Sequence, residues 1–500
     1  MKIGFVSLGC PKNLVDAEVM LGLAESAGHE ITADPNGADV LVVNTCAFID
    51  RAKQESIDTI LEMAELKKQV PGRRLVVTGC MAERYRDELK KEIPEIDAVL
   101  GTGEVPAILQ AIQPAVGSRN SGIVGATPLS FYRRDPATDD RRPTTGHRPP
   151  TADPRPLSPD SPQFGIDLPD YLYDADTPRR LATPGHYAYL KIAEGCDYKC
   201  AFCIIPKMRG HYRSRTSESI VKEAHALVAR GVKELLLISQ DTTFYGIDRK
   251  ERGALPRLLR ELDAVDGLEW IRLLYLYPTT ISDDVIAAIA ECDKVVKYID
   301  LPLQHASDAV LQRMKRPGTR AGYEKLLAKI RARIPGVTLR TTFIVGFPGE
   351  TDQDFDELMA FIETVGFDHL GVFTYSHEEG TSAFGLVDDV PAAVKKRRQS
   401  RLMARQKQIV KKRQKGRVGE RARLIVDGPS PEHELVLRGR LGGQAPDIDP
   451  LVYLTECDVS ALAAGDIVDV EIVGAHGYDL VARPVDADRP SAGGTVASLR

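Results

Sequence analysis

The sequence predicts an α/β protein with three folded parts: an N-terminal open parallel α/β sheet, a partial (β/α)6 barrel, and a small C-terminal β-barrel of OB-like texture. Two long stretches alternate short apolar, β-branched runs with helical patterns, which is typical of parallel sheets covered by helices. A third stretch contains short strand-like runs without helices between them, which indicates a small barrel. A chain of 500 residues is long enough for about three domains.

Residues 1–113 form the first α/β stretch. Its strand-like runs are KIGFVSL, ADVLVVN and RRLVVTG. Helical patterns lie between them, such as NLVDAEVMLGLAESAG, which ends at Gly28. We therefore expect an open parallel sheet with helices over its faces.

Residues 114–185 differ in composition from the rest of the chain. They contain 13 of its 32 prolines, mixed with Arg, Asp, Thr and Ser. Such a composition buries little apolar surface, so we expect a largely disordered linker here.

Residues 186–415 form the second α/β stretch. Two of its helices have clear ends: one runs from Ser217 to Gly231, and the other from Thr351 as N-cap to Gly366. The strand-like runs are YAYLKIA, KELLLIS, EWIRLLYL, VKYIDLPL, VTLRTTFIVG and FDHLGVFTYS. Six βα units predict a partial barrel whose active site lies where the strands end.

Residues 416–484, called the small barrel below, contain the runs RARLIV, LVLRGRL and DIVDVEIV. We expect residues 485–500 to be a flexible tail. The helical-looking segment 395–417 carries twelve Lys or Arg residues and no acid. This segment is either the charged outer face of a helix that bridges the two barrels or a surface for RNA.

Composition argues against several classes of protein. The net charge of −5 does not indicate a general polyanion binder. No apolar run approaches the roughly 18 residues of a membrane span, and the N-terminus lacks the long apolar region of a signal peptide. We therefore expect a cytoplasmic protein, in which clustered cysteines indicate metal binding or catalysis rather than disulfides.

Three cysteines lie in the loop after the first barrel strand. Cys196, Cys200 and Cys203 have the spacing C-x3-C-x2-C. Three thiolates can hold three irons of a 4Fe–4S cluster and leave the fourth iron open to another ligand. Zinc is the alternative, with His211 completing a Cys3His set, although a structural zinc has no reason to lie at the active-site end of a barrel.

A second set of three cysteines lies in the N-terminal part. Cys10, Cys46 and Cys80 each end a predicted strand, in VSLGC, VVNTC and VVTGC. Because ligands bind at the carboxyl ends of parallel strands, we expect the three side chains to converge at one edge of the sheet. They predict a second cluster with an open iron, and the alternative is a set of buried structural thiols.

The first triplet carries a resemblance to a known family. C-x3-C-x-aromatic-C, with Phe202 as the aromatic residue, resembles the signature of radical S-adenosylmethionine (SAM) enzymes. In that family the open iron binds the amino and carboxylate groups of SAM, and one electron releases a 5′-deoxyadenosyl radical. The resemblance implies that Phe202 lies against the adenine side. It implies further SAM contacts from later strand ends, with Gln240 in SQDTT, Gln304 in PLQH, and Gly346 and Glu350 in FIVGFPGE as candidates, although GFPGE alone is as typical of a plain turn before a helix.

The two triplets and the small barrel together resemble the radical SAM methylthiotransferases, which combine a three-cysteine domain, a radical SAM barrel and a TRAM domain. The resemblance covers nearly the whole chain except the linker. It implies two 4Fe–4S clusters and two SAM molecules, one as methyl donor and one as radical source, that attach a CH3–S group to an unactivated carbon. A radical step suits such a carbon, because a general base tuned near neutral pH cannot open a C–H bond with no acidic character.

Sequence details favour the RimO type of this family, which modifies the β-carbon of an aspartate in small-subunit ribosomal protein S-twelve. LGCPKNLVDAE, PLQHAS, LRTTFIVGFPGE and GQAPDID resemble RimO-type segments. The MiaB type, which modifies an adenosine of tRNA, is the alternative. An RNA-binding module would not explain six patterned cysteines, and an electron-transfer iron–sulfur protein normally fills every iron position with protein ligands.

The charge of the small barrel supports a protein substrate. Residues 416–484 carry six Lys or Arg and twelve Asp or Glu. Such a surface repels tRNA and attracts a strongly basic ribosomal protein, free or in the ribosome, unless it is simply a solvated acidic surface. We also expect an electron donor such as flavodoxin or ferredoxin, and a monomeric chain.

An aspartate substrate would bring a carboxylate into a closed site, where a cation should meet it. The candidates are Lys12, in the loop after the first cysteine, and Arg340, on the fifth barrel strand. The alternatives are that Lys12 is solvated and that Arg340 belongs to a structural ion pair. Asp447 and Asp449 of the small barrel are the candidates for docking the basic protein.

Overall fold

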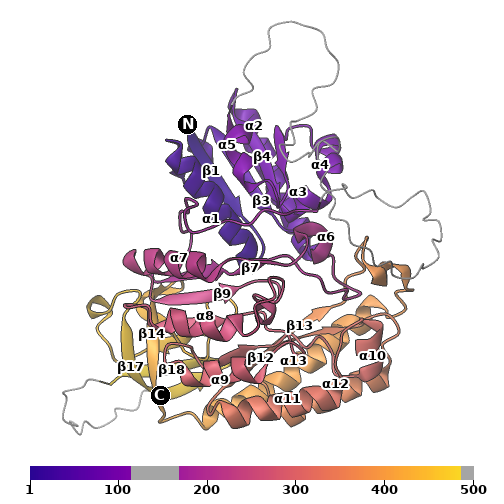
Figure 1. Ribbon diagram of the computed structural model, residues 1–500, viewed down its shortest axis with the longest axis vertical. Helices are drawn as coiled ribbons and strands as arrows, with labels where there is room; N and C mark the ends of the chain where they lie inside the picture. The colour runs from indigo at the N-terminus through magenta and orange to yellow at the C-terminus, as the bar shows by residue number, and fades with distance from the viewer. Residues whose placement is uncertain (114–167, 486–500) are drawn as a thin grey trace, which may run out of the picture. The chain divides into compact units, whose positions relative to one another are not determined.

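The N-terminal part is a five-stranded parallel sheet in the order β2-β1-β3-β4-β5. Figure 1 labels its central strands β1, β3 and β4. The three predicted strands are confirmed. The two others are only three residues long, too short to give a readable pattern of apolar residues. The strands are β1 Lys2–Ser7, β2 Glu30–Thr32, β3 Val40–Thr45, β4 Arg74–Gly79 and β5 Ala98–Leu100.

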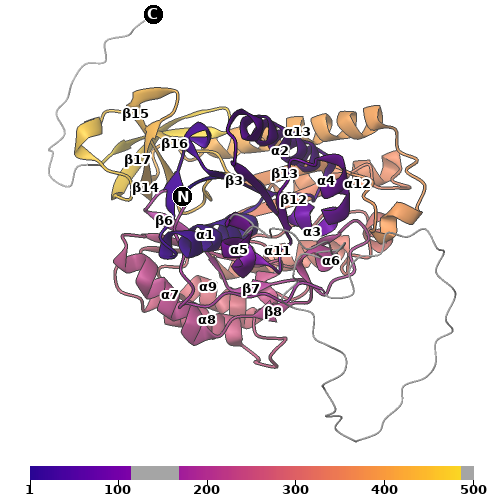
Figure 2. The same cartoon turned by 90° about the horizontal axis from the view of Figure 1, so that it is seen from above.

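Helices cover both faces of this sheet (Figure 2). One face packs on α1 (Pro11–Ser26) and α5 (Ile108–Ile112). The other packs on α2 (Asp50–Gln69), α3 (Cys80–Arg84) and α4 (Arg86–Glu92). The predicted open α/β sheet is therefore confirmed, with its strand ends at the cysteines.

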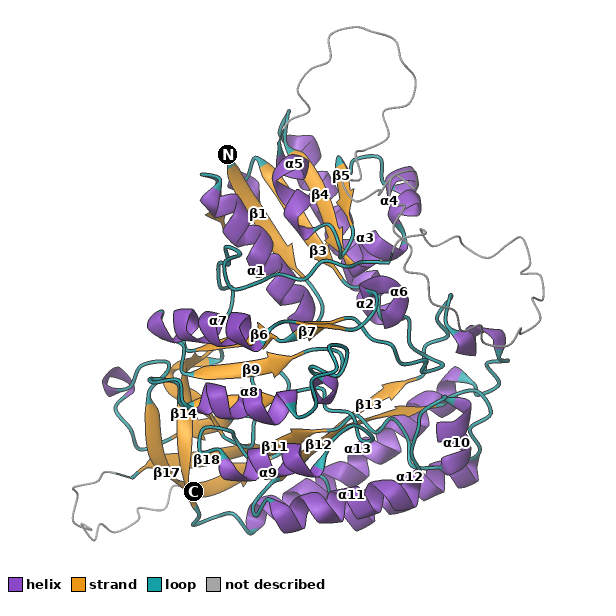
Figure 3. Ribbon diagram, viewed as in Figure 1, coloured by secondary structure: helices purple, strands orange, loops and turns teal. Residues whose placement is uncertain are grey.

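The second part is a six-stranded partial barrel, and all six predicted strands are present. Figure 3 labels β6, β9, β11, β12 and β13 among them. They pair as two parallel sheets, β10-β9-β6 and β11-β12-β13, which an isolated bridge between Ile271 and Val295 connects. The strands are β6 Tyr187–Lys191, β9 Glu234–Ile238, β10 Trp270–Leu273, β11 Tyr298–Asp300, β12 Thr338–Val345 and β13 His369–Thr374. The helices are α7 Ser217–Ala229, α8 Ala254–Asp263, α9 Asp283–Glu291, α10 Asp308–Arg313, α11 Arg320–Arg333 and α12 Asp352–Val365.

The predicted helix ends are confirmed by their caps. The hydroxyl of Thr351 accepts a hydrogen bond from the Asp354 amide in a capping box, and Gly366 ends α12 in the left-handed conformation. Between β6 and α7, the segment with the first cysteine triplet adds β7 (Ala193–Glu194), α6 (Ile205–Arg209) and β8 (Arg213–Ser214).

The third part is a closed β-barrel, as predicted, and its five strands lie in the order β14-β15-β16-β18-β17. Its strands are β14 Arg421–Ser430, β15 His433–Leu441, β16 Val452–Leu454, β17 Ile467–His476 and β18 Asp479–Pro484. The helix α13 (Ala392–Lys415) precedes it and contains most of the basic segment.

Several of the basic charges of α13 are used within the protein. Its cations form ion pairs with acids of α12 and nearby loops: Lys395 with Asp388, Arg398 with Glu350 and Asp352, Arg405 with Glu363, and Arg413 with Asp368. Near its end, Gln414 donates a hydrogen bond to the carbonyl of Tyr478 in the small barrel. These contacts favour the bridging helix over the RNA surface.

The structure, a computed structural model, describes residues 1–113 and 168–485. Most of the predicted linker and the tail from residue 486 lie outside this range. Residues 168–185 belong to the predicted linker but pack on the folded parts. Tyr173 is 3% exposed, and Arg179 forms ion pairs with Glu18 and Glu223, each at 2.6 Å. In the described part of the chain, no helix is long and apolar enough to cross a membrane.

The segment that contains Arg179 lies directly on α1 at Gly22. A Cβ atom on Gly22 would lie 2.5 Å from the backbone of Pro178 and Arg179. Alanine normally favours a helix interior over glycine by about 0.5–1 kcal/mol. We predict that Gly22→Ala instead lowers stability by about 1–3 kcal/mol, because the backbone segment must move.

Thermal unfolding of the full chain under anaerobic conditions measures this effect. The control is Ser26→Ala, at an exposed position near the end of the same helix. A Gly22→Ala protein as stable as the wild type would show that the segment does not pack tightly on α1.

Candidate active site

Cys10, Cys46 and Cys80 lie at the carboxyl ends of β1, β3 and β4. Cys10 is the N-cap of α1, and Cys80 is the first residue of α3. The glycines before them, Gly9 and Gly79, have φ of +96° and +93°, which side chains rarely adopt. A Cβ atom on Gly9 would also lie 3.2 Å from the sulfur of Cys46. The tight backbone therefore brings the three strand ends together, as the sequence predicts.

The thiols of this triplet lie close enough to act on one another. Burial, together with the neighbouring Cys80 and Cys10, raises the pKa of Cys46 to about 12. Burial also raises the pKa of Cys80, against the opposing charge of Arg209. Burial acts on Cys10 too, but Lys12 and Arg209 outweigh it and lower its pKa.

Cys196, Cys200 and Cys203 lie in one loop between β7 and α6. The amide of Cys196 donates to the carbonyl of Gly210 at 3.1 Å, and that of Cys203 to Cys200 at 3.1 Å. Burial raises the pKa of Cys196 to about 12, and burial together with Cys200 raises that of Cys203. Arg316 donates to the sulfur of Cys200 at 3.8 Å.

Both triplets fit an iron–sulfur cluster in donor type and in surroundings. Each offers three thiols in a largely buried site with a guanidinium beside one sulfur. The zinc alternative loses its fourth ligand, because His211 is 82% exposed and pairs with Asp197 at 2.9 Å. Within residues 1–113 and 168–485, no three Cys, His, Asp or Glu side chains form a closed metal-ligand set, so the ligand assignment stays a proposal.

Polar atoms around the barrel triplet have no partner. Among the described residues, the hydroxyl of Tyr277, Oε1 of Gln240 and Nε of Arg316 are buried without a hydrogen bond. The ring of Tyr277 stacks on the ring of Tyr198 with 4.0 Å between centroids, and the guanidinium carbon of Arg316 lies 4.3 Å from the centroid of the Tyr277 ring. Unpaired buried polar atoms are costly, so this region fits a polar ligand such as SAM.

The residues expected to contact SAM have different surroundings. Phe202 is partly buried beside the cluster of Phe347 and Tyr375. Gln240 donates to the carboxylate of Glu194. Gln304 has φ of +74°, and its amide donates to the carbonyl of Thr342 at 2.8 Å, which extends the pairing of β11 with β12.

Gly346 and Glu350 belong to a turn that is held by its own contacts. The carboxylate of Glu350 accepts hydrogen bonds from the amides of Gly346 and Phe347, and it pairs with Arg398 of α13 at 2.9 Å. Gly346 has φ of +77°. GFPGE is thus a turn before α12, and the Glu350 side chain is occupied within the protein.

Lys12 is buried rather than solvated, with 7% of the residue exposed. Its Nζ lies 3.1 Å from the centroid of the Tyr275 ring. Among the described residues, no carboxylate lies in direct ion-pair contact with Lys12, although the charges of Cys10, Glu194 and Asp300 act on it from nearby. Burial lowers its pKa to about 8.

Arg340 belongs to a structural ion pair, the alternative that the sequence left open. It pairs with Asp300 at 2.9 Å and with Asp449 at 3.3 Å. Burial opposes its charge, but these two carboxylates, with Tyr298, raise its pKa. Arg340 therefore already has its counter-ions.

The two expected docking residues differ in exposure. The side chain of Asp449 is 1% exposed and accepts a hydrogen bond from the hydroxyl of Tyr298 at 2.7 Å. It attaches the small barrel to the partial barrel, so the expectation that it meets a docking partner is wrong. Asp447 is exposed and accepts from the hydroxyls of Tyr187 and Tyr189, each at 3.2 Å.

A buried group of four charges, which the sequence analysis missed, links the two cysteine regions. This four-charge cluster consists of Asp16 of α1, Lys191 of β6, Glu194 of β7 and Arg209 of α6. Arg209 also reaches the sulfur of Cys80 at 3.5 Å. In the sequence, the one feature that marks Arg209 as a candidate is its place in KMRG, shortly after the barrel triplet.

A second ion group joins the N-terminal part to the loop after β13. The buried carboxylate of Glu378 pairs with Arg84 of α3 and Lys53 of α2, each at 2.9 Å. Arg84 also donates to the carbonyl of Glu379 at 2.8 Å. Because α3 begins at Cys80, this contact fixes a second side of the N-terminal triplet.

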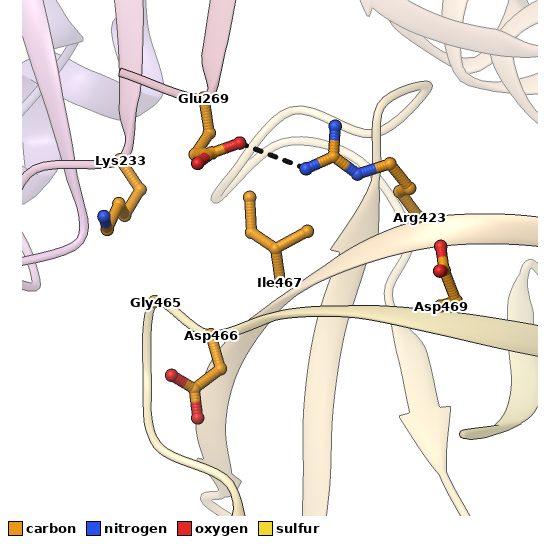
Figure 4. Close-up of a pocket in the computed structure, with 7 residues that line it drawn as sticks. All are labelled: Lys233, Glu269, Arg423, Gly465, Asp466, Ile467 and Asp469. Atoms are coloured by element: carbon orange, nitrogen blue, oxygen red, sulfur yellow. Dashed lines mark hydrogen bonds and ion pairs between the residues drawn. The ribbon is translucent and has the colours of Figure 1, made fainter. Parts of the chain in front are cut away.

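A cavity of about 440 Å³ lies at the other ends of the barrel strands (Figure 4). Lys233 and Glu269 directly precede β9 and β10, and Arg423 from β14 pairs with Glu269 at 3.0 Å. The cavity is lined by Lys233, Glu269, Arg423, Gly465, Asp466, Ile467 and Asp469. It contains no cysteine, and its ion pair holds the small barrel to the partial barrel.

Comparison with known proteins matches all three folded parts. Residues 2–101 match Uncharacterized protein family UPF0004, residues 190–362 the Radical SAM superfamily, and residues 418–485 the TRAM domain. The ribosomal protein uS12 methylthiotransferase RimO of Koribacter versatilis is 49% identical, over 96% of this chain and 96% of that protein. The protein of the same name from Geotalea uraniireducens is 46% identical, over 96% and 97%. Among solved structures, the radical SAM methyltransferase TsrM from Kitasatospora setae has 16% identity and a TM-score of 0.49, over 74% of this chain and 72% of that chain.

The Glu378 contact yields a stability prediction. Glu378→Ala leaves two cations without their shared carboxylate, one of them fully buried, so we predict a loss of about 3–5 kcal/mol. Thermal unfolding of the full chain measures it. The control is Glu379→Ala, whose exposed side chain can be removed while its carbonyl still accepts from Arg84. Equal stability of the two variants would contradict a role of Glu378 in joining the parts.

Proposed function

Because this chain belongs to the RimO family of radical SAM methylthiotransferases, we propose that it attaches a methylthio group to the β-carbon of an aspartate in ribosomal protein uS12. The observation that carries the proposal is the position of α6. This helix follows the barrel triplet directly, and its Arg209 reaches Cys80 of the other triplet. The barrel triplet and the N-terminal triplet are thus connected through one short helix. A reaction that combines a radical with a sulfur donor requires two such neighbouring sites.

The cysteines have separate roles in this proposal. Cys196, Cys200 and Cys203 hold one 4Fe–4S cluster, and the N-terminal triplet holds another. When bound, the barrel cluster supplies the electron for SAM cleavage and the N-terminal cluster supplies an iron for sulfur. Two SAM molecules are used, one for the methyl group and one for the radical, and a flavodoxin or ferredoxin supplies electrons.

The protein's own groups bind and orient the ligands. The unpaired atoms of Tyr277, Gln240 and Arg316 are donors and acceptors for SAM beside the barrel triplet. The stack of Tyr198 on Tyr277 excludes water from this side. The Tyr198 hydroxyl donates to Asp241 at 2.9 Å, which holds the stack in place.

Lys12 binds the carboxylate of the substrate aspartate in this proposal. It is the buried cation next to Cys10, and its described contact is the face of Tyr275 rather than an acid. A buried charge needs a counter-ion, and an incoming carboxylate supplies it. Asp447 remains the candidate for docking a basic protein, because its side chain is exposed on the acidic small barrel.

Substitution of the cysteines tests the division of roles. We predict that Cys196→Ala abolishes the formation of 5′-deoxyadenosine, while Cys10→Ala retains at least part of it and makes no methylthiolated uS12. The products are measured by liquid chromatography and by mass spectrometry of uS12. Cys292→Ala is the control, because this buried cysteine lies outside both triplets.

Either of two results would overturn this division. One is methylthiolated uS12 from the Cys10→Ala protein. The other is a wild-type enzyme that leaves uS12 unmodified and modifies an adenosine of tRNA, which would support the MiaB-type reaction.

Substitution of Lys12 tests substrate binding. We predict that Lys12→Met lowers kcat/KM for uS12 by roughly 10- to 100-fold, since a hydrogen bond to a charged group contributes about 1.5–3 kcal/mol. Cleavage of SAM without uS12 should continue at the wild-type rate. Lys2→Met, at an exposed position of β1, is the control. An equal loss of SAM cleavage in Lys12→Met would show that Lys12 supports the cysteine site instead of the substrate.

A further inference from the structure

Arg209 is a buried guanidinium with acceptors on both sides of the boundary between the N-terminal part and the barrel. Only 2% of the Arg209 surface is exposed to solvent. One terminal nitrogen donates to Asp16 at 2.7 Å and to Glu194 at 3.1 Å. The other donates to the side-chain oxygen of Asn13 at 3.2 Å and to the sulfur of Cys80 at 3.5 Å.

The charges around Arg209 balance only when it is present. Asp16 and Glu194 are shared by Lys191 and Arg209, so the four-charge cluster holds two charges of each sign. Without the guanidinium, an excess negative charge would remain beside the sulfur of Cys80. Hydrogen bonds to ligand sulfurs and nearby net charge are two of the protein features that tune the potential of an iron–sulfur cluster.

We propose that Arg209 is a positioning residue that raises the reduction potential of a cluster held by Cys10, Cys46 and Cys80, through its bond to the Cys80 sulfur. The inference rests on the proposed function, since it presupposes that cluster. Reduction adds a negative charge to the cluster, and an adjacent cation stabilises that state. Because Arg209 ends the helix that follows the barrel triplet, the segment that forms one site also sets the electron affinity of the other.

A buried arginine could also have a purely structural role. Substitution of Lys191 distinguishes this structural role from an effect on the cluster potential. Lys191 pairs with the same two carboxylates, Asp16 and Glu194, but it has no described contact with a cysteine. Lys191→Met therefore disrupts the four-charge cluster and leaves the donor to Cys80 in place. Arg209→Gln removes the positive charge beside the Cys80 sulfur. Arg209→Lys keeps a positive charge but loses the planar guanidinium with its fixed donor directions.

The experiment is an anaerobic redox titration of the full-length holoenzyme, followed by electron paramagnetic resonance, with iron content measured for each variant. A protein with Cys196, Cys200 and Cys203 changed to Ala assigns the signal of the N-terminal cluster. We expect Arg209→Gln to make reduction of that cluster at least tenfold less favourable, a downward shift of about 59 mV for one electron. We expect smaller shifts for Arg209→Lys, which keeps the charge, and for Lys191→Met, which changes the nearby net charge but keeps the donor to Cys80, and wild-type potentials for the barrel cluster in every variant.

A wild-type potential in both Arg209 variants would overturn the inference, and so would an equal shift in Lys191→Met. If Arg209→Gln does not fold, Arg209→Lys and Lys191→Met still decide between these outcomes. A wild-type enzyme with iron at the barrel triplet alone would overturn the proposed function itself, which is a different result from an unshifted potential.

Discussion

The four buried charges of Asp16, Lys191, Glu194 and Arg209 are the constraint on which the arrangement of the two cysteine sites depends. Asp16 belongs to the N-terminal part, and the other three belong to the barrel. A buried charge that loses its partner costs several kcal/mol, so neither part can bury its share of this group alone. The spacing of the two triplets is therefore set by side-chain ion pairs in direct contact.

Apolar packing supports the same connection. Ile204 and Met208, on either side of the start of α6, lie in the apolar core of the N-terminal part with Cys80 and Met81. The hydroxyl of Thr102 donates to the carbonyl of Met208 at 2.5 Å. The segment after the barrel triplet thus belongs to the barrel by sequence and to the N-terminal core by packing. Movement of one triplet relative to the other would have to break both the ionic and the apolar contacts.

The sequence predicted the two triplets because their signal is local. Cys196, Cys200 and Cys203 lie within one loop, and Cys10, Cys46 and Cys80 each follow a recognisable strand. The strands of the sheet and partial barrel were also predictable from their apolar runs. The short strands β2, β5 and β16 were missed, because three residues give no pattern, and the six-residue strand β18 was not named either. The partners of Arg209 and Glu378 were missed because Asp16 lies 193 residues from Arg209, and Arg84 lies 294 residues from Glu378. A charged residue in a sequence is normally taken as a surface residue, and only the folded chain pairs it in the interior.

The contacts of Lys12 and Arg340 show which of these two buried cations has a structural role and which can bind a ligand. Arg340 meets two carboxylates, so its charge is neutralised before any ligand arrives. Lys12 meets the face of Tyr275, a residue held at φ of +59°, and a cation–π contact contributes only about 2 kcal/mol when desolvated. Strained backbone costs about 1–3 kcal/mol and persists where the surrounding structure enforces it, commonly at functional sites. A buried lysine that lies against a strained aromatic residue beside Cys10, with no carboxylate in direct contact, can therefore still bind an anion, whereas a third anion beside Arg340 would only add repulsion.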